Sequence, residues 1–222
     1  MKTVAMVPAR LGSQRLKKKN LREINGTSLV ALAVRKCREA GCFDEIWVNS
    51  ESSEIGEIAA DEHALFYQRP AQFADDNATS EDFVADFFEN VDCENLVQVH
   101  SIAPLLSAME VRAFTESFLS SDCDVYLSRI DNYLEHIHCG EPVNFSLSEK
   151  TNSQNLLPVS CLSWAVSGWR KEIFLAAHST GNCATYYGKL GTFPVSQVSG
   201  HAIKTESDLL IAQQLFGIVK QL

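Results

Sequence analysis

The sequence predicts an α/β fold in which helices cover both faces of a mostly parallel β-sheet. Strand-like and helix-like segments alternate along the chain, which is the pattern of repeated strand–helix–strand units. Several helix-like segments also open with recognisable capping residues. A chain of 222 residues is long enough to bury one core of this kind. We therefore expect a single domain over residues 1–222.

The predicted strands are short and largely apolar. They cover residues 3–7, 45–49, 96–100, 124–130 and 164–169. The predicted helices cover residues 27–40 and 54–63, two segments that open at 79–82 and 107–110, and a last segment from 205 to 219. Thr205 and Asp208 fit the N-terminal cap of that last helix better than a catalytic role. The helix after residue 79 places Phe83, Phe87 and Phe88 at core spacing, and Trp164 is interpreted as a core or interface aromatic.

One long segment fits neither pattern. From residue 133 to residue 160 the periodicity lapses into polar residues with prolines and asparagines. This is too long for a simple connection between two elements of a compact domain. We expect an excursion that covers a site or contacts a partner subunit.

Composition narrows the class of ligand. The formal net charge of −9 disfavours non-specific binding to nucleic acid or to an anionic membrane surface. The chain has no apolar run of transmembrane length and no signal-peptide pattern at its N-terminus. Its seven cysteines form no Cys-x-x-Cys pair, which is typical of reduced thiols in a cytoplasmic protein, and we assign none a catalytic role. Cationic residues concentrate in the first forty positions, which favours a small anionic ligand held in a focused site.

The most informative motif follows the first predicted strand. Residues 7–21 read Val-Pro-Ala-Arg-Leu-Gly-Ser-Gln-Arg-Leu-Lys-Lys-Lys-Asn-Leu, a cationic loop with a Gly-Ser turn. A strand that ends in such a loop offers backbone N–H groups and fixed positive charge to a phosphate chain. Neither the P-loop motif nor the dinucleotide Gly-x-Gly-x-x-Gly motif is present. Spacing alone leaves a basic surface loop as an equal alternative.

Four segments in order resemble the cytidylyltransferases that activate acidic sugars, which are the acylneuraminate (CMP-sialic acid synthetase) and 3-deoxy-octulosonate enzymes. The first is the pattern Val-Pro-Ala-Arg-x-Gly-Ser-x-Arg-Leu-x-x-Lys-Asn-Leu just described. The others are residues 69–80, which begin Arg-Pro, Gln98 followed by Pro104-Leu105 with a short insertion between them, and residues 204–209. The resemblance spans nearly the whole chain.

The resemblance implies a Rossmann-like fold of the nucleotide-diphospho-sugar transferase type and a homodimer that uses residues 133–160. It implies an enzyme that couples CTP to a nonulosonic (sialic-acid-like) 2-keto sugar acid and releases pyrophosphate. The residues that would contact the nucleotide by this resemblance are Ala9, Arg10, Leu11, Gly12, Ser13, Arg15, Lys19, Asn20, Arg69, Asp76 and Gln98. Fixed cations stabilise the charge that develops during nucleotidyl transfer, so Arg10, Lys19 and Lys204 are the catalytic candidates.

The acceptor sugar has weaker candidates. Ser101 follows the central strand, and Ser163 lies in the stretch that matches the family's sugar-acid-binding segment. His136 and His138 alternate on a predicted strand, and we interpret them as a polar wall of the sugar pocket. A plain surface strand is nearly as good an explanation for the two histidines. The neighbouring pair His100-Ser101 lacks a legible third acid and oxyanion hole, so we assign His100 a structural role.

The metal site departs from the family pattern. Relatives bind catalytic Mg²⁺ with an Asp-x-Asp pair or a single Asp, where this chain has Ala202 and Lys204. Mg²⁺ prefers carboxylate oxygens, which neither side chain supplies. We still expect Mg²⁺, held by the nucleotide phosphates or by a carboxylate such as Asp76 or Asp208. Three alternatives stay open: Lys204 replaces part of the metal's charge, the chain is a non-catalytic relative that binds nucleotide or sugar, or it is a nucleotidyltransferase with another acceptor.

Overall fold

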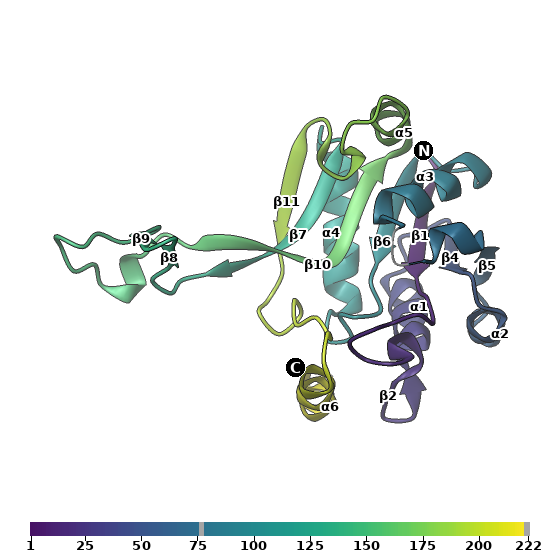
Figure 1. The fold of residues 1–222 in the computed structure, drawn as a ribbon, viewed down its shortest axis with the longest axis horizontal. Coiled ribbons are helices and arrows are strands. Elements are labelled where there is room, and N and C mark those ends of the chain that lie inside the picture. The colour runs from purple at the N-terminus through teal and green to yellow at the C-terminus, as the bar shows by residue number, and fades with distance from the viewer. Residues whose placement is uncertain (76–77, 220–222) are drawn as a thin grey trace.

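In the computed structural model, which describes residues 1–75 and 78–219, a seven-stranded sheet forms the centre of the molecule (Figure 1). Its strand order is β11-β7-β10-β6-β1-β4-β5. The strands are β1 (Thr3–Pro8), β4 (Glu45–Ser50), β5 (Leu65–Gln68), β6 (Asn95–Val99), β7 (Val125–Asn132), β10 (Val159–Arg170) and β11 (Leu190–Pro194). Every neighbouring pair is parallel except the two pairs made by β10. The predicted α/β class with a mostly parallel sheet is confirmed.

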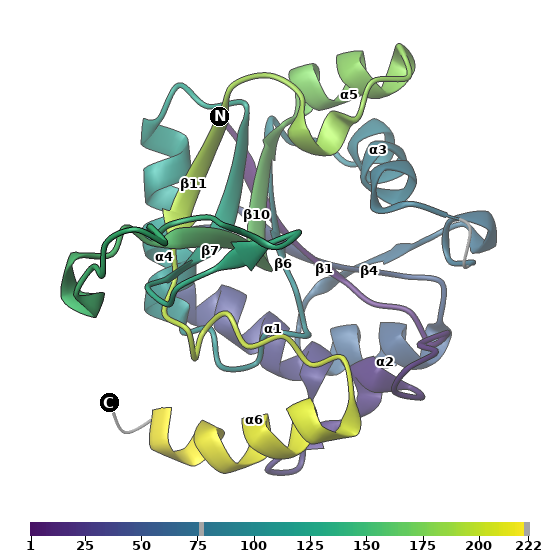
Figure 2. The ribbon, with the colours of Figure 1, turned by 60° about the vertical axis from the view of Figure 1, so that its left-hand side comes forward.

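Helices cover both faces of this sheet (Figure 2). They are α1 (Leu29–Ala40), α2 (Ser53–Asp61), α3 (Ser80–Asn90), α4 (Ala108–Ser120), α5 (Lys171–Ser179) and α6 (Glu206–Val219). Alternate residues of β1 separate the two faces, because Ala5 and Val7 pack in the cluster with α1, α2 and α4, whereas Val4 and Met6 pack with α3 and α5. Helix α6 lies apart, in a third cluster that includes Leu105 and Ile203.

The predicted caps are present. Thr79 and Asp82 form a reciprocal capping box at α3, and Ser107 and Glu110 form another at α4. Helix α1 starts at Ser28, whose side chain accepts from the Ala31 N–H, and ends at Gly41 in the left-handed region. These local signals explain why the helix boundaries were predictable to within a few residues.

Within the central sheet and its covering helices, three elements were not predicted: the edge strands β5 and β11, and helix α5. The short hairpin of β2 (Glu23–Ile24) and β3 (Thr27–Ser28) was not predicted either. The edge strands have mostly half-exposed or exposed side chains, so their sequences lack the continuous apolar run that marks the central strands. The predicted strand at 164–169 is the second half of the twelve-residue β10, which contains a bulge between Leu162 and Ser167.

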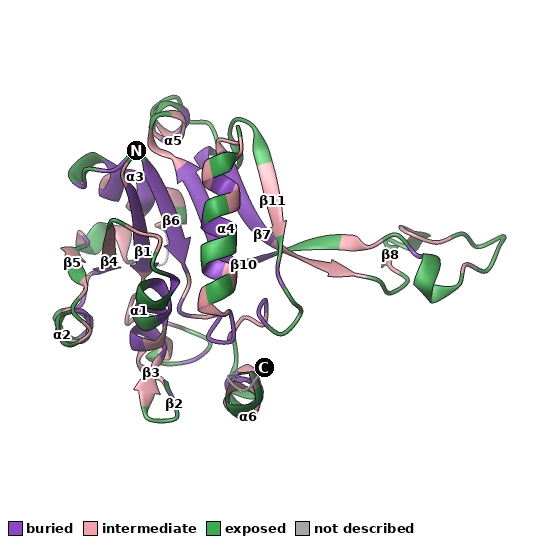
Figure 3. Cartoon of the chain, turned by 180° about the vertical axis from the view of Figure 1, so that it is seen from behind, coloured by how far each residue is buried: buried purple, intermediate pink, exposed green. Residues whose placement is uncertain are grey.

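The segment after β7 projects away from the sheet as an arm (Figures 1 and 3). It carries the two-residue strands β8 (Ile137–His138) and β9 (Glu141–Pro142), which pair with each other. Most arm residues are exposed, including apolar side chains such as Leu134, Leu147 and Leu157. We use the name arm for residues 133–158.

Two glycines give a matched test of the packing. A Cβ on Gly168 in β10 would lie 2.9 Å from the ring of Phe118, which is fully buried. A Cβ on Gly217 in α6 would meet nothing within 4 Å. We expect Gly168→Ala to lower the free energy of unfolding by about 1–3 kcal/mol through overpacking. Gly217→Ala is expected to leave it unchanged or raise it by about 0.5–1 kcal/mol, because alanine favours the helix. Urea denaturation measures both, and equal effects would contradict the packing.

Candidate functional site

Hydrogen bonds to the sheet and to a buried side chain hold the loop that follows β1. The Ala9 N–H donates to the Asn49 carbonyl at 3.0 Å, which continues the sheet for one residue. The Asn20 amide donates from Nδ2 to the Arg10 carbonyl at 2.8 Å, and the Ser101 hydroxyl donates to Asn20 Oδ1 at 2.7 Å. The buried Asn20 side chain therefore joins the loop after β1 to the loop after β6.

A cavity of about 580 Å³ opens over this loop, at the carboxyl ends of β1, β5 and β6. It is lined by Pro8, Ala9, Arg10, Ser13, Gln14, Arg15, Leu16, Lys19, Asn20, Arg69, Ser80, Phe83, His100, Ile102 and Lys204. Five of these side chains are cationic, and no Asp or Glu stands among the lining residues of the described chain. In a protein of net charge −9, this is a focused positive site. We call it the cationic cavity.

The charges in this cavity interact with one another. Burial lowers the pKa of the half-buried Lys19, and repulsion from Arg15, Arg10 and Lys204 lowers it further. Neither Lys19 nor Lys204 is in an ion pair within the described part of the chain. Bringing like charges together costs free energy that a bound anion removes. The cavity is therefore suited to an anion that carries several phosphate or carboxylate groups.

Arg69 forms a rigid part of the wall. It is 3 % exposed, its Nε donates to Asn49 Oδ1 at 2.6 Å, and its Nη2 donates to the Asn49 carbonyl at 2.8 Å. The guanidinium lies over the ring of Phe83, 4.2 Å from the centroid. Burial lowers the pKa of Arg69 to about 10, which leaves it cationic at neutral pH. The prediction that Phe83 belongs to the core was incomplete, because its half-buried ring also faces the cavity.

Seven of the predicted nucleotide residues line this cavity: Ala9, Arg10, Ser13, Arg15, Lys19, Asn20 and Arg69. Leu11, Gly12 and Gln98 do not line it. The Leu11 N–H donates to Glu51 Oε1 at 2.9 Å, and Gln98 is buried with its Nε2 at 2.6 Å from His100 Nε2. Asp76 lies outside the described residues. The contact of each residue with a nucleotide stays a prediction.

His100 has a more prominent place than its sequence position indicated. It directly follows the central strand β6, lines the cationic cavity, and also lines a second cavity of about 510 Å³. Burial lowers the pKa of His100 to about 4, and the nearby Lys19 charge contributes. The imidazole is therefore neutral at physiological pH and can accept a hydrogen bond at one nitrogen.

The second cavity adjoins the first through Ser80 and His100, which line both. Its other walls are Thr79, Glu81, Trp164, Cys183, Thr185 and Tyr186. Trp164 has a φ of 56°, which is rare for an aromatic residue, and its ring lies edge-on to Tyr186 with centroids 6.1 Å apart. We call this the aromatic cavity. Sequence reasoning missed it because the bulge that turns Trp164 inward leaves no periodic signal.

The four predicted acceptor residues line neither cavity within one copy of the chain. The Ser101 hydroxyl is used by Asn20, and the Ser163 hydroxyl donates to Ser128 Oγ at 2.8 Å. Ser128 Oγ also accepts from the Ala165 N–H, so Ser163 helps to hold the bulge that carries Trp164. His136 and His138 lie on the projecting arm (Figure 1). Their roles toward an acceptor stay predictions, without support from a single subunit.

The side chains at the expected metal positions supply no oxygen ligand. Lys204 lines the cationic cavity, and Asp208 Oδ2 accepts from the N–H groups of Lys204 and Thr205 at 2.9 and 2.8 Å. The Thr205 hydroxyl also donates to this oxygen, so the carboxylate is committed to capping α6. Residues 1–75 and 78–219 contain no group of three or more His, Cys, Asp or Glu that could hold a metal. The described residues thus do not fit a protein-bound Mg²⁺ site.

Comparison with known proteins shows which family this chain belongs to. Residues 4–199 match the family model described as cytidylyltransferase. The chain belongs to the cytidylyltransferase family. This confirms the family resemblance; the first three of the four sequence segments lie within the matched residues, and residues 204–209 lie beyond them.

Individual relatives are more distant. A pseudaminic acid cytidylyltransferase of Campylobacter jejuni is 31% identical over 127 residues, which are 54% of this chain and 55% of that protein. An N-acylneuraminate cytidylyltransferase of Streptococcus agalactiae is 28% identical over 131 residues, 58% of this chain and 32% of its own length. This chain thus aligns with about half and about a third of these two relatives. Post-translational flagellin modification protein B of Campylobacter coli is 23% identical over 93% of this chain and 92% of that protein.

Solved structures confirm the fold. A CMP:2-keto-3-deoxy-manno-octonic acid synthetase complexed with CTP superposes with a TM-score of 0.74 over 100% of both chains, at 15% identity. A 4-diphosphocytidyl-2C-methyl-D-erythritol synthase of Anaerococcus prevotii gives 0.71 at 13% identity over 97% of this chain and 98% of that one. The search for membrane spans found no helix among the described residues that is long and apolar enough to cross a bilayer.

The neutral state of His100 makes stability depend on pH. Its pKa is about 4 in the folded protein, against an ordinary value of 6.5, so the unfolded chain binds the proton more readily. Stability is therefore lost as pH falls from 6.5 toward 4. Between pH 7 and pH 4.5, we expect the unaltered protein to lose about 2 kcal/mol more unfolding free energy than His100→Gln. Urea denaturation at both pH values measures this, with His138→Gln on the exposed arm as the control. Equal losses in all three proteins would contradict a buried neutral His100.

Proposed function

We propose that this chain is a nucleotidyltransferase that joins CTP to a nonulosonic 2-keto sugar acid, forming the CMP-sugar and pyrophosphate. The observation that carries this proposal is the cationic cavity, which gathers Arg10, Arg15, Lys19, Arg69 and Lys204 with no described carboxylate in its wall. Membership of the cytidylyltransferase family supports it. The names of the aligned relatives support a sialic-acid-like acceptor in particular.

Within this proposal, Arg10, Arg15 and Lys19 bind the triphosphate. Guanidinium groups suit paired contacts with phosphate oxygens, and the lysine adds a compact charge. In the reaction, the anomeric hydroxyl of the sugar acid loses its proton to solvent, its oxygen bonds to the α-phosphorus, and the bond from that phosphorus to the pyrophosphate oxygen breaks. Negative charge grows on the departing pyrophosphate, so Arg10, Lys19 and Lys204 stabilise the transition state more than the ground state. The rigid Arg69–Phe83 pair is then the proposed binding surface for the cytidine part of CTP.

The aromatic cavity is the proposed acceptor site. Transfer requires the attacking oxygen to lie within about 3–3.5 Å of the phosphorus, so the two substrate sites must adjoin. The two cavities share Ser80 and His100, which meets this requirement. The acceptor nitrogen of the neutral imidazole at this junction is used by the Gln98 amide, so its Nδ1–H is left as a donor for a substrate oxygen. Trp164 and Tyr186 offer flat apolar surfaces of the kind that pack against sugar rings.

Mg²⁺ remains the proposed cofactor, with phosphate oxygens of the nucleotide as its main ligands. The chain contributes Lys204 where relatives of this family place a carboxylate. An ammonium neutralises phosphate charge at that position, although it cannot bridge oxygens as a metal does. The same substitution favours a second candidate function, that of a non-catalytic relative which binds CTP without turnover.

We further propose a cytoplasmic homodimer. All seven cysteines are unpaired thiols, which suits a reducing compartment. The arm exposes several large apolar side chains, which are Tyr133, Leu134, Ile137, Val143, Leu147 and Leu157, and covering them with a second copy buries this surface. Such pairing is also the one arrangement that could bring His136 and His138 toward a partner's acceptor site.

The test of the proposed reaction is pyrophosphate release, measured for each of the four nucleoside triphosphates with a panel of keto-sugar acids. We expect release with CTP and a nonulosonic acid. Lys19→Ala is expected to weaken CTP binding about 10- to 100-fold, because one charge-assisted contact is lost. Lys17→Ala is the matched control, since Lys17 is exposed and does not line the cavity. Failure of CTP to bind, or equal effects of the two substitutions, would refute the nucleotide site.

Lys204 gives a separate prediction about the metal. Lys204→Ala should lower kcat at least about tenfold, because a transition-state contact is lost, with CTP affinity changed less. Lys204→Asp should make turnover depend more steeply on the Mg²⁺ concentration than in the unaltered protein, because the new carboxylate supplies an oxygen ligand. Steady-state kinetics over a Mg²⁺ series measure both effects, with Lys189→Ala on the exposed surface as the control. Full activity of Lys204→Ala would rule out a role for this ammonium.

A further inference from the structure

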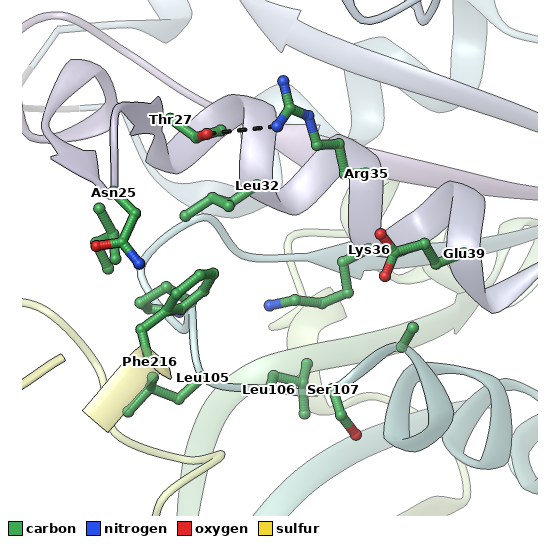
Figure 4. A pocket seen from close by; sticks show the side chains of 13 residues that line it. Asn25, Thr27, Leu32, Arg35, Lys36, Glu39, Leu105, Leu106, Ser107 and Phe216 are labelled. Carbon is green, nitrogen blue, oxygen red and sulfur yellow. Dashed lines mark hydrogen bonds between the residues drawn. The ribbon is translucent and has the colours of Figure 1, made fainter. Parts of the chain in front are cut away.

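A third cavity, of about 350 Å³, lies between α1, the segment after β6, and α6 (Figure 4). Its walls are partly apolar, with Leu32 from α1, Leu105 and Leu106 from the segment after β6, and Phe216 from α6, and polar and charged side chains complete the rim. It shares no lining residue with the cationic or the aromatic cavity. The proposed transfer reaction therefore leaves it without a role.

One of the charged side chains that line this cavity, Lys36, is buried. Lys36 is 7 % exposed, and its Nζ lies inside the cavity between the apolar walls (Figure 4). Its ammonium donates one hydrogen bond, to the Ala103 carbonyl at 2.8 Å. Among the described residues it forms no ion pair, and its two other N–H groups have no protein acceptor. Burial lowers the pKa of Lys36 to about 8, an effect that the charges of Glu110 and Glu39 only partly oppose.

A buried ammonium of this kind is costly to the fold. Removing a charge from water without a partner carries a penalty of several kcal/mol. An apolar residue would pack better against Leu32 and Leu106 if stability were the only constraint. A ligand that brings its own negative charge to the two remaining N–H groups of Lys36 removes this penalty.

The other charges at the rim restrict the class of ligand. The Arg35 guanidinium is engaged by Glu62 through contacts of 2.6–3.0 Å and by the Thr27 hydroxyl, so it does not add to the charge of Lys36. Glu39 also lines the cavity, and its carboxylate opposes the binding of any anion, most strongly one that carries several negative charges. One available cation within apolar walls suits a monoanion with an apolar body. A polyphosphate does not fit this arrangement.

We propose that this cavity binds a small monocarboxylate with an apolar body, its carboxylate on Lys36 and its body against Leu105 and Phe216. The site is an effector site, because the chain segment it touches also forms the cationic cavity. The Ala103 carbonyl accepts from Lys36, whereas His100 and Ile102 line the cationic cavity. The Ile102 carbonyl accepts from the Ile203 N–H at 2.8 Å, next to Lys204. A ligand on Lys36 thus acts on residues 100–104 and on the approach of Lys204.

The first experiment measures binding and does not depend on the proposed reaction. The probes are 3-phenylpropionate and its neutral amide, titrated into the full chain by calorimetry. We expect the acid to bind at least tenfold more tightly than the amide, and Lys36→Met to remove this preference. Lys189→Met, which deletes an exposed lysine, and Lys19→Ala, which alters the cationic cavity, should keep it. Equal affinity for acid and amide, or a preference that survives Lys36→Met, would overturn the proposal.

An NMR titration of the unaltered protein covers the case in which Lys36→Met does not fold. The amide signals of residues 103 and 105–107 should shift with 3-phenylpropionate, whereas those of residues 10–20 should shift less. The reverse pattern would place the acid in the cationic cavity and overturn the site.

The second experiment tests the coupling, which rests on the proposed function because it uses CTP. Calorimetry of CTP with and without saturating 3-phenylpropionate should show at least a threefold difference in Kd. An unchanged Kd would overturn the effector role. If CTP did not bind at all while the acid still bound through Lys36, the proposed function would fail and the second site would stand.

Discussion

The site depends on one buried side chain, Asn20, which joins the cationic loop after β1 to the uncharged segment after β6. Its amide donates to the Arg10 carbonyl, and its oxygen accepts from the Ser101 hydroxyl. The loop after β1 carries Arg10, Arg15 and Lys19, and the segment after β6 leads through Ile102 to Lys204. Burial, and then repulsion from Arg15, Arg10 and Lys204, lowers the pKa of Lys19, so the bonds of Asn20 help to hold cationic groups that would otherwise move apart. The fold thus keeps these like charges close together, and binding of a polyanion would reduce their repulsion.

Most of the fold could be predicted from the sequence, because the patterns that mark its strands and helices are local or strictly periodic. The central strands are continuous apolar runs, since a parallel strand is buried on both faces. The capped helices carry Ser or Thr three residues before an acid. The edge strands β5 and β11 were missed because half of an edge strand meets water, and its composition then resembles a loop.

The site was predictable to the extent that topology decides it. Parallel strands bring their carboxyl ends to one edge, so the loop with Arg10 and Lys19 and the segment with Arg69 had to meet there. Side-chain direction was not predictable in the same way. Ser101 and Ser163 stand at the right places in the chain, yet both hydroxyls turn inward to internal partners. Trp164 became a cavity wall through a bulge, which depends on pairing with a distant strand.

In the proposed reaction, a lysine at position 204 in place of a carboxylate would change the charge balance around the phosphates. A metal ion held by aspartates adds a positive charge that its protein ligands partly cancel, so the net field on the phosphates is moderate. Here the wall already holds five cations and no described carboxylate. A divalent ion in this cavity gains attraction only from the nucleotide, and it must overcome repulsion from Lys19 and Lys204. The nucleotide and its metal would therefore enter together as one complex, with the protein binding the phosphate oxygens that the metal leaves free. In the proposed reaction, Lys204 would therefore bind the anion and would not bind the metal.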